Sequence, residues 1–448
     1  MKRILAVLAA LVLILASYGM AAAEQETRKM ETAADADEFI AVFLGERPEE
    51  LEGVWAMSVQ MEAAVKQLGG LGEMAKKLSA FGTPEKIEPA YEGEVRGIKA
   101  FFIPCKFSAM AVDIVLPVQD GLIAGLSTAA YSGGKETEEA GNDAFDSIEL
   151  ALPVPSLGEL PGILTVPKGE GPFPAVVLIH GSGSSDRDET VGNLKPFRDI
   201  AEGLAAQGIA VYRFDKRSYV FGTEMATDRT ITLESESIED AVNAVQMLAA
   251  QEKINPERIL VLGHSLGGNA IPAIARALKE APVKACGFIM MAASPRPLDV
   301  LVREQYDFLY SLMPEVTEEQ QAEKDAVFAE LDKLKDPDAL AEDEKVMGVG
   351  TAYWKWLADY DILQAAEEIT QPVLLLQGEE DYQTTMADFG IWKEALGEKE
   401  NWQLKSYPGL THPFTAGRKT EGSAAYMKDE KTDAQVILDI AEFVNGIK

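Results

Sequence analysis

The feature that most constrains the fold of this chain is a glycine-flanked serine, Ser265, between a predicted strand and a predicted helix. The apolar run 258–262 is followed by Gly-His-Ser-Leu-Gly-Gly at residues 263–268. In this context a G-x-S-x-G turn strains the serine backbone and requires small neighbours, which glycines provide. The hydroxyl then stands clear of the sheet, beside the N-terminal amides of the following helix. The pattern predicts that Ser265 is a nucleophile. The alternative is a plain glycine-rich turn.

The general base that such a serine needs can be sought by elimination, because the chain contains only 3 histidines. His180 ends an earlier apolar run, and His264 lies inside the serine turn, where we expect it to point elsewhere. His412 follows the strand-like residues 402–406 in a loop late in the chain. A lone loop histidine is often a solvated side chain, but the order serine, acid, histidine is the one required here. We therefore predict that His412 is the base.

The acid is expected at the end of a strand between the serine and the histidine. Residues 372–381 have the sequence Pro-Val-Leu-Leu-Leu-Gln-Gly-Glu-Glu-Asp, in which a buried parallel strand precedes a glycine turn and carboxylates. Asp381 is the preferred acid, and Glu380 is the second choice because it should face away. A helix N-cap before residues 383–396 is an alternative role for Asp381, and the two roles do not exclude each other.

Hydrolysis through a serine also needs two backbone amides aimed at the oxygen on which negative charge develops. The residue after the nucleophile, Leu266, is predicted to supply one of them. The other is expected from the loop after the apolar run 175–179, where the sequence is His-Gly-Ser-Gly. The amide of Ser182 is the preferred donor, and that of Gly183 is the alternative.

Apolar runs typical of strands alternate with helical patterns through the C-terminal part of the chain. The runs are residues 161–166, 175–180, 209–214, 258–263, 286–292, 373–377 and 402–407. Residues 237–240, Ser-Ile-Glu-Asp, predict a capping box at the start of one helix. The alternation predicts an α/β fold with a doubly wound, mostly parallel sheet. Ligands bind at the carboxyl ends of such strands, which is where Ser182, Ser265, Asp381 and His412 fall.

Taken together, these motifs make residues 148–448 resemble an α/β-hydrolase. Within that superfamily the chain resembles bacterial exported esterases of the dienelactone-hydrolase and serine-aminopeptidase-like branch. The stretches that carry the resemblance are His-Gly-Ser-Gly-Ser-Ser-Asp-Arg-Asp at 180–188, Tyr-Arg-Phe-Asp-Lys-Arg at 212–217, the serine turn at 263–268, and Gln-Gly-Glu-Glu-Asp-Tyr at 377–382. The resemblance implies a serine hydrolase with a catalytic triad. Residues 35–131 resemble a small uncharacterised domain found ahead of such secreted hydrolases, which implies nothing about substrate.

The first residues have the pattern of a secretory signal peptide. A positive start, Met-Lys-Arg, is followed by an apolar stretch over 4–16 and by three alanines at 21–23. We therefore expect residues 1–23 to be removed and the mature protein to be secreted or held in the cell envelope. The apolar stretch is short for a membrane span, so stable membrane insertion after cleavage is not expected. An uncleaved N-terminal anchor is the alternative.

The segment after the signal peptide is predicted to form a small α+β domain over residues 24–131. Its first part, 35–78, has a helical pattern, and strand-like runs follow at 98–107, 111–117 and 122–130. The segment contains no histidine and shows no catalytic pattern. Its role is not indicated by the sequence.

A polar, glycine-rich segment, residues 132–147, is predicted to link this domain to the α/β-hydrolase domain of residues 148–448. The α/β alternation stops from about 295 to 360, where Thr-Glu-Glu-Gln at 317–320 predicts a capped helix. We interpret this insertion as a helical cap over the active site. Its aromatic side chains either line a pocket or form the cap's own core; they are Tyr306, Phe308, Tyr310, Tyr353, Trp354 and Trp356.

The charge balance is strongly acidic, with 41 basic and 73 acidic residues and a formal net charge of −32. Nucleic acid and anionic membranes are bound through basic patches, so neither is an expected partner. No histidine or cysteine cluster suggests a metal, and no cofactor is expected. Residues 186–188, Asp-Arg-Asp, fit either an internal ion pair or a cation site, and the ion pair is preferred. Cys105 and Cys286 are expected to be free. The sequence does not indicate an oligomeric state.

The function predicted from these residues is the cleavage of small-molecule carboxylic esters through an acyl-enzyme on Ser265. An exported serine peptidase or aminopeptidase with the same triad is one alternative. It would need a carboxylate to hold the substrate amine, for which Glu304 and Asp307 are candidates. A protein that binds a cell-envelope polymer, with a secondary hydrolase activity, is another alternative. The complete set of Ser265, Asp381 and His412 argues against it.

Overall fold

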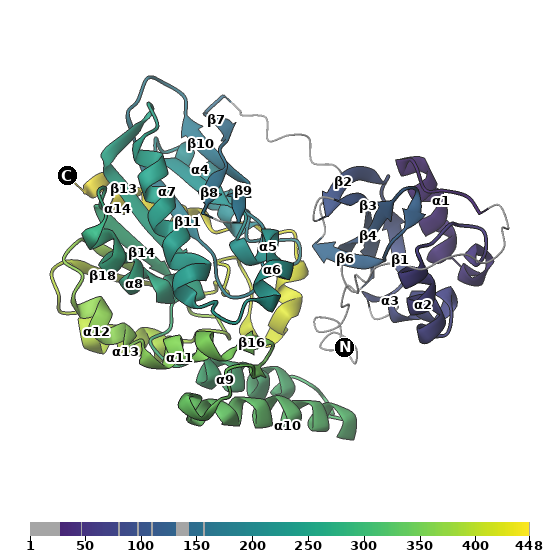
Figure 1. The fold of residues 1–448 in the computed structure, drawn as a ribbon. Helices are drawn as coiled ribbons and strands as arrows, with labels where there is room; N and C mark the ends of the chain where they lie inside the picture. Colours follow the sequence, from purple (N-terminus) through teal and green to yellow (C-terminus); the bar gives the residue numbers. More distant parts are fainter. Residues whose placement is uncertain are drawn as a thin grey trace. The chain divides into compact units, whose positions relative to one another are not determined.

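The computed structural model describes residues 27–45, 47–78, 81–95, 98–108, 111–130, 143–155 and 157–447. The chain divides into two compact units, the smaller made mainly of residues before 140 and the larger of residues from 140 onward (Figure 1). The predicted signal peptide, residues 1–23, lies outside the described residues, as do residues 132–142 of the predicted linker.

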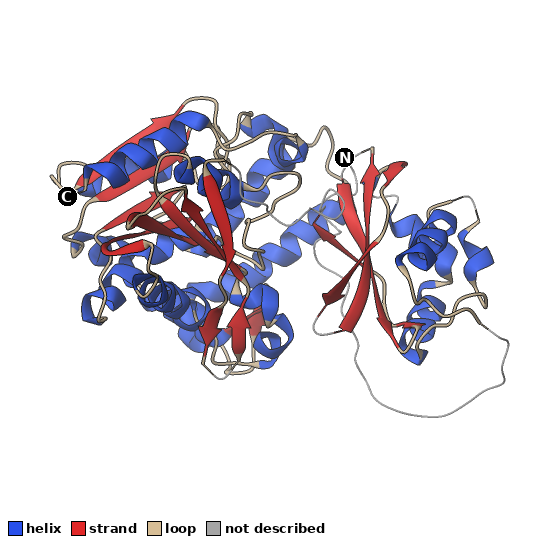
Figure 2. Ribbon diagram, turned by 90° about the horizontal axis from the view of Figure 1, so that it is seen from above, coloured by secondary structure: helices blue, strands red, loops and turns tan. Residues whose placement is uncertain are grey.

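The smaller unit consists of helices followed by a six-stranded antiparallel sheet. Figure 2 shows its helices on one face of that sheet. Side chains from α1, β3 and β4 form its apolar core, including Phe39, Phe43, Phe101, Ile103 and Ile114. Its elements are α1 (Ala33–Phe43), a 3₁₀ turn (Pro48–Leu51), α2 (Val59–Leu68), α3 (Leu71–Leu78), β1 (Pro84–Ile87), β2 (Tyr91–Val95), β3 (Ile98–Phe107), β4 (Ala111–Gln119), β5 (Leu122–Ile123) and β6 (Ser127–Ala130).

The helical pattern and the strand runs predicted for this unit are present, but β1 and β2 are not anticipated by the sequence pattern. Both are short and carry charged residues, and all four residues of β1 are exposed. Such strands lack the alternation of apolar and polar residues by which a half-buried strand is recognised. They form because each pairs with β3. This pairing is a tertiary contact, which the preferences of neighbouring residues do not reveal.

The larger unit is built around an eight-stranded sheet with the order β18-β17-β14-β13-β11-β12-β10-β7. Neighbours from β18 to β12 are parallel, whereas β10 is antiparallel to both β12 and β7. The predicted mostly parallel sheet is therefore confirmed. The strands are β7 (Phe145–Glu149), β10 (Gly162–Pro167), β11 (Phe173–Ile179), β12 (Ala210–Phe214), β13 (Ile254–His264), β14 (Gly287–Met291), β17 (Val373–Gly378) and β18 (Trp402–Tyr407), and β8 (Leu152–Val154) pairs separately with β9 (Gly158–Leu160).

Helices cover both faces of this sheet (Figure 2). Alternate residues of β11 pack on opposite faces of the sheet. Val177 packs with α7 (Glu239–Ala249), α8 (Leu266–Glu280) and α13 (Met386–Leu396). Val176 packs with α4 (Pro196–Ala205) and α14 (Ala434–Gly446). A strand buried on both faces needs a continuous apolar run, which is why β11 and β13 are recognisable in the sequence. The covering helices are α4, α7, α8, α12 (Ile362–Glu367), α13 and α14.

The interruption predicted at 295–360 is largely helical. Thr317 caps the second of its helices, and the capping box with Gln320 is present as predicted. Figure 1 shows α9 and α10, in green, projecting together from the body of the larger unit. The elements of this insertion, which we call the cap, are α9 (Leu298–Ser311), α10 (Glu318–Asp332), 3₁₀ turns (Lys333–Lys335 and Pro337–Ala339), β15 (Lys345–Val346), β16 (Val349–Gly350) and α11 (Thr351–Asp359).

Two local predictions are wrong. Strand β7 begins at Phe145 and pairs with β10, so residues 145–147 belong to the larger sheet and not to the linker. Residues 237–240 form no capping box, because a π-helical turn (Glu234–Ile238) runs directly into α7. No side chain of the described residues caps either the turn or α7, although Thr232 Oγ1 accepts from Ser235 N at 3.4 Å just before the turn.

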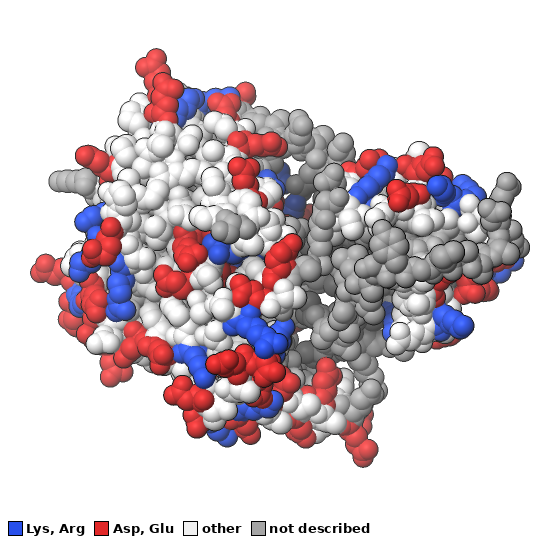
Figure 3. Space-filling view, viewed as in Figure 1, with Lys and Arg blue, Asp and Glu red and all other residues white. Residues whose placement is uncertain are grey.

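The surface of the chain reflects its acidic composition. Figure 3 shows Asp and Glu side chains over much of the visible face, with Lys and Arg among them. Within the described residues, no helix is both long and apolar enough to span a bilayer.

Candidate active site

Ser265 occupies the sharp turn between β13 and α8, with φ 53° and ψ −121°, a conformation that residues with side chains rarely adopt. The flanking glycines make this turn possible. A Cβ on Gly263 would lie 2.1 Å from the Gly267 carbonyl oxygen, and a Cβ on Gly267 would lie 2.2 Å from the Ile179 carbonyl oxygen. Ser265 N donates to Met291 O at 2.8 Å, which ties the turn to the end of β14. The strand–turn–helix geometry predicted from the sequence is present.

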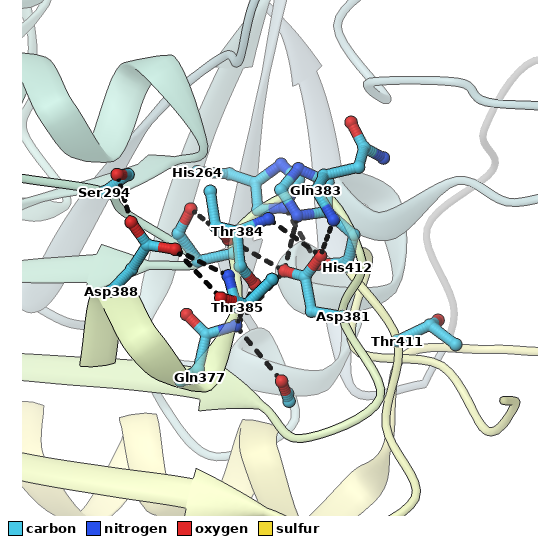
Figure 4. Close-up of polar contacts among 12 residues, drawn as sticks. His264, Ser294, Gln377, Asp381, Gln383, Thr384, Thr385, Asp388, Thr411 and His412 are labelled. Carbon is cyan, nitrogen blue, oxygen red and sulfur yellow. Dashed lines mark hydrogen bonds and ion pairs between the residues drawn. The ribbon is translucent and has the colours of Figure 1, made fainter. Parts of the chain in front are cut away.

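His412 and Asp381 meet at the same edge of the sheet. Their loops follow β18 and β17, whose last residues, Tyr407 and Gly378, are paired in register. His412 Nδ1 donates to Asp381 Oδ2 at 2.6 Å, and both side chains are buried (Figure 4). Because the carboxylate is an acceptor, the proton lies on Nδ1 and Nε2 of the neutral imidazole is left with a free lone pair. This is the arrangement of a histidine base oriented by an acid.

Asp381 is held in place by its own loop. Its Oδ1 accepts from Gln383 N at 2.7 Å and from Thr384 N at 3.1 Å. Its Oδ2, which faces His412, also accepts from Thr384 Oγ1 at 2.8 Å and from Gln377 Nε2 at 3.2 Å. Sequence reasoning missed Gln377 and Thr384, because neither belongs to a motif that marks an orienting residue. These bonds fix the carboxylate in the orientation that His412 requires.

The two alternatives considered for this loop are not supported. Glu380 is turned elsewhere, and its Oε2 accepts from Lys419 N at 3.0 Å. Helix α13 begins at Met386 and is capped by Thr385, not by Asp381. The amides bound by Asp381 belong to the turn that precedes this helix.

The loop after β11 presents unused amides beside the serine. A Cβ on Gly181 would lie 3.0 Å from Ser265 Cβ, so the loop passes directly over the nucleophile turn. Gly181 N donates to Glu189 Oε1 at 2.6 Å and is therefore occupied. In the described part of the chain, the amides of Ser182, Gly183 and Leu266 donate to no other protein group. All three candidates named from the sequence thus have a free N–H.

Lys216 sets the orientation of this loop and was not recognised from the sequence. Its side chain is buried, and its Nζ donates to Gly181 O at 2.8 Å and to Gly183 O at 3.0 Å. In a trans peptide the N–H points opposite to the C=O. Holding the Gly181 carbonyl toward Lys216 therefore turns the Ser182 N–H to the other side, away from the lysine. This geometry favours Ser182 over Gly183 as the second oxyanion donor.

The two remaining histidines have different environments. His180 lies between Phe197 and Phe214, with ring centroids at 5.0 and 5.6 Å, and burial lowers its pKa to about 4. It is therefore a neutral core residue. His264 directs its ring away from the serine, as expected, but toward His412: its Nε2 donates to His412 O at 3.0 Å.

Residues 186–188 form ion pairs, but not within the tripeptide. Arg187 makes a two-pronged contact with Asp215, at 3.0 Å from Nε and 2.9 Å from Nη2. Asp188 accepts from the buried Arg213 at 2.9 Å. Asp186 binds Thr190 through Oγ1 at 2.7 Å. The preferred interpretation of this tripeptide, an internal ion pair, is confirmed for Arg187 and Asp188, whose partners come from β12 and the loop after it.

We call the loop after β11, residues 180–184, the oxyanion loop. A cavity of about 580 Å³ lies between this loop and the cap. Ser182, Gly183 and Leu266 line it on one side, and Trp354 and Tyr353 on the other. Trp354 also belongs to the cap's own core, so the two roles considered for the cap aromatics coincide in this residue. The lining combines apolar side chains, such as Met225 and Val349, with charged ones, such as Glu236 and Asp343.

Two aromatic residues of the cap, Phe308 and Trp356, neither line the cavity nor belong to the cap's own core. Trp356 does not line the cavity; it packs on the main core and on Tyr360, with ring centroids 5.0 Å apart. Phe308 stacks on Tyr382 at 5.5 Å, which joins α9 to the loop of Asp381. The tertiary packing, not the aromatic composition, decides which of these rings reach the cavity.

Comparisons with known proteins agree with this geometry. Residues 171–416 match the Hydrolase_4 family, described as serine aminopeptidase, S33. Esterase EstD of Thermotoga maritima is 37% identical over 326 residues, which cover 73% of this chain and 74% of that protein.

Solved structures were also matched. An esterase of Pyrococcus furiosus, Pf2001, is 17% identical with a TM-score of 0.42, over 68% of this chain and 91% of that chain. A puromycin-hydrolysing peptidase of Mycobacterium tuberculosis is 18% identical with a TM-score of 0.45, over 78% of this chain and 46% of that chain.

The family match covers more than half of the chain and includes the serine turn, the loop of Asp381 and His412. The relative EstD extends over nearly three quarters of it. The resemblance inferred from the motifs is confirmed, and the chain belongs to the serine aminopeptidase, S33, family of α/β-hydrolases, enzymes of the serine-hydrolase type.

Proposed function

We propose that the protein is a carboxylesterase that forms an acyl-enzyme on Ser265. The observation that carries the proposal is the buried pair of His412 and Asp381, 2.6 Å apart, at the same sheet edge as the strained turn of Ser265. The unused amides of Ser182 and Leu266 complete the set of groups that acyl transfer requires. The similarity to an esterase over most of the chain supports the same reaction class.

In the proposed first step, Ser265 Oγ attacks the ester carbonyl carbon while His412 Nε2 takes the hydroxyl proton. Asp381 orients the imidazole and stabilises its charged form. The carbonyl oxygen becomes an oxyanion and accepts from the Leu266 and Ser182 amides, with Gly183 as the alternative donor. The bond to the alcohol oxygen then breaks, and the departing alcohol receives the proton from His412. An acyl group remains on Ser265.

In the second step, water attacks the acyl carbon and gives a proton to His412. The bond between the acyl carbon and Ser265 Oγ breaks, and Oγ takes the proton back. The products are a carboxylic acid and the free enzyme. Neither step consumes a cofactor, because Ser265 and water supply the protons and His412 transfers them.

The cavity supports an apolar acyl or aryl group as the bound part of the substrate. Its lining includes apolar side chains such as Trp354 and Met225, and burial of an apolar group against them releases ordered water and stabilises the complex. The carboxylates considered as amine ligands are engaged elsewhere. Glu304 pairs with Arg296 at 2.6 Å, and Asp307 pairs with Lys324. Neither of these two carboxylates is therefore available to a substrate amine. Others, such as Glu236 and Asp343, line the cavity, so the comparison of esters with anilides decides between the two reactions.

A single experiment separates the candidate functions. The purified protein is assayed with chromogenic acyl esters and with aminoacyl anilides, and it is labelled with a fluorophosphonate. We expect higher kcat/KM for small to medium acyl esters than for any anilide, and labelling at Ser265. If anilides are cleaved better than every ester, the protein is a peptidase. Labelling at another serine contradicts the mechanism, and the absence of any hydrolysis favours the polymer-binding alternative.

We further propose that the protein is exported and that residues 24–131 fold as a separate domain ahead of residues 148–448. The positive start, apolar stretch and three alanines at 21–23 support export. The intact mass of the protein from the producing cell tests it, with a chain beginning near Glu24 as the expected result. A mass that includes residues 1–23 would favour the uncleaved anchor.

A further inference from the structure

A second histidine–carboxylate pair, Glu189 and His264, lies within the candidate active site. Glu189 Oε2 is 2.9 Å from His264 Nδ1, and both side chains are buried. Among the described residues, neither atom has a hydrogen-bond partner, so their contact is an ion pair rather than an aligned hydrogen bond. The mechanism above gives this pair no task, although a buried ion pair is costly to maintain.

The pair touches all three loops that the reaction uses. Glu189 Oε1 accepts from Gly181 N at 2.6 Å in the oxyanion loop. His264 immediately precedes Ser265 in the nucleophile turn. His264 Nε2 donates to the backbone oxygen of His412 at 3.0 Å, and the two imidazole rings are 4.7 Å apart (Figure 4).

The backbone of Glu189 indicates that the loop is shaped to deliver this carboxylate. Its φ is 52°, in the left-handed region that residues with a side chain seldom occupy. Strain of this kind persists only where surrounding contacts enforce it, and it is common at functional sites. Ser265 has a φ of 53° and is strained in the same way, and Gly181 lies beside both residues.

The two acceptors that face the His264 ring favour a proton on each of its nitrogens. One nitrogen faces the Glu189 carboxylate and the other faces the His412 carbonyl, and both partners are acceptors. A neutral imidazole has one N–H and would therefore point a lone pair at one of them. The imidazolium satisfies both. Although burial opposes the charged form, the Glu189 carboxylate outweighs it and raises the pKa of His264.

The comparison with His180 shows that burial alone does not produce this state. His180 is equally buried, but its ring is packed by phenylalanines and the pKa is lowered to about 4. The charged groups that act on the pair are few. Asp381 also favours the charged form of His264, while His180 contributes to the lowered pKa of Glu189. Lys216 lies near His180. The carboxylate of Glu189 is thus the group that distinguishes the two histidines.

We propose that Glu189 and His264 are positioning residues for acyl transfer: a buried carboxylate–imidazolium pair that holds the oxyanion loop, the nucleophile turn and the His412 loop together. The pair orients Gly181 and the His412 backbone, and it places a fixed positive charge beside the catalytic imidazole. The inference rests on the proposed function, since it assigns a role within the same reaction.

The protonation state is tested first, without any assay of activity. The chain has only 3 histidines, so ¹⁵N-histidine NMR of the whole protein resolves each ring. At about pH 7.5, well above the ordinary titration of an imidazole, we expect one ring to be doubly protonated and two to be neutral. The doubly protonated signal is assigned to His264 by its loss in His264→Gln. A neutral His264 at this pH contradicts the proposal.

The kinetic test uses Glu189→Gln, which keeps an oxygen for Gly181 N–H but removes the charge. The amide NH₂ of glutamine can donate to His264 Nδ1, so His264 becomes neutral in this variant. We expect the ¹⁵N signal of the doubly protonated ring to be lost in this variant and kcat to fall with little change in KM. A purely structural role for Glu189 would leave the protonation of His264 unchanged.

Glu189→Ala removes the hydrogen bond to Gly181 N and the ion pair with His264. We expect kcat to fall by about 10²-fold with little change in KM, because small displacements of catalytic groups have effects of that size. Asp240→Asn is the matched control. It breaks the buried pair of Asp240 with Arg217, 2.6 Å apart on α7 and α5 (Arg217–Val220). Among the described residues, the Arg217 side chain bonds to Glu239 and Asp240 and not to the three loops. This control should lower stability but leave kcat within about twofold of wild type.

The possible outcomes separate this inference from the proposed function. If both Glu189 variants keep the wild-type kcat while Ser265→Ala is inactive, the positioning role is wrong and the esterase proposal stands. If Ser265→Ala retains activity, the proposed function is wrong. If Asp240→Asn loses kcat as strongly as Glu189→Ala, the effect is one of general stability. Far-UV circular dichroism of every variant confirms that it is folded.

Discussion

The two units of this chain differ in what they bury. Among the described residues, the only buried polar or charged side chain of the smaller unit is Asp113, at 1% exposure. The larger unit buries many more, and several lie at the carboxyl edge of its sheet, such as Asp381, His412, His264 and Lys216. Buried charges cost free energy unless they are paired, so a fold keeps them where they serve a purpose.

The difference identifies the larger unit as the site of chemistry. The smaller unit maximises apolar contact between its helices and its sheet, which is what stability alone requires. The larger unit has a similar apolar interior on both sheet faces, and then adds strained backbone and paired charges at one edge. Substitutions in the two units should therefore have different consequences, and the following experiments measure that difference.

The largest effect is expected from Ser265→Ala. Without the hydroxyl no acyl-enzyme can form, and kcat should fall by at least about 10³-fold while the fold is retained. Steady-state kinetics on the best ester of the panel measures the fall, and mass spectrometry checks that fluorophosphonate labelling is lost. A variant that remains labelled and active would show that Ser265 is not the nucleophile.

His412→Gln is expected to have an effect of similar or slightly smaller size. In the wild-type protein the rate should fall as the pH is lowered, because protonated His412 cannot accept the proton of Ser265. The variant should lose most activity, by about 10³-fold, and with it this pH dependence. A pH–rate profile from acid to neutral measures both. Near-full activity with an unchanged profile would show that a different base operates.

Trp354→Ala should have a moderate effect that appears mainly in KM. Trp354 lines the cavity beside the oxyanion loop, so truncation removes apolar contact with the substrate. We expect KM to rise by about tenfold for bulky acyl esters, with a smaller change in kcat. Trp356→Ala is the matched control, since this neighbouring ring packs away from the cavity. Equal changes in KM for the two variants would argue against the cavity as the substrate site.

The smallest effect on catalysis is expected from Ile114→Ala in the smaller unit. Ile114 is fully buried in β4, and its truncation should destabilise the unit by about 2–5 kcal/mol. Urea unfolding followed by circular dichroism measures this loss. The kcat/KM for a small ester should stay within about twofold of wild type, because the unit contributes no catalytic group. A large loss of activity would show that the smaller unit shapes the site.

Local sequence determined the buried parallel strands of the larger unit and the nucleophile turn. A parallel strand buried on both faces is a continuous apolar run, so β11, β13 and β17 are visible without tertiary information. The glycines around Ser265 are equally legible, because only residues without Cβ fit against Gly267 O and Ile179 O. Asp381 and His412 were identified because each closes a strand in the order that the mechanism requires, and the structure brings them into contact.

Only the tertiary structure decided how these groups are supported. Gln377, Thr384, Lys216 and Glu189 act through contacts between different loops, and nothing in their immediate neighbours signals those partners. The same reason explains the errors: a capping box at 237–240 matched a local pattern, but the helix had already begun upstream. Short-range preferences fix backbone elements because they depend on neighbouring residues. The charge state of a buried side chain depends on whichever groups the fold brings within a few ångströms, as His180 and His264 demonstrate within one site.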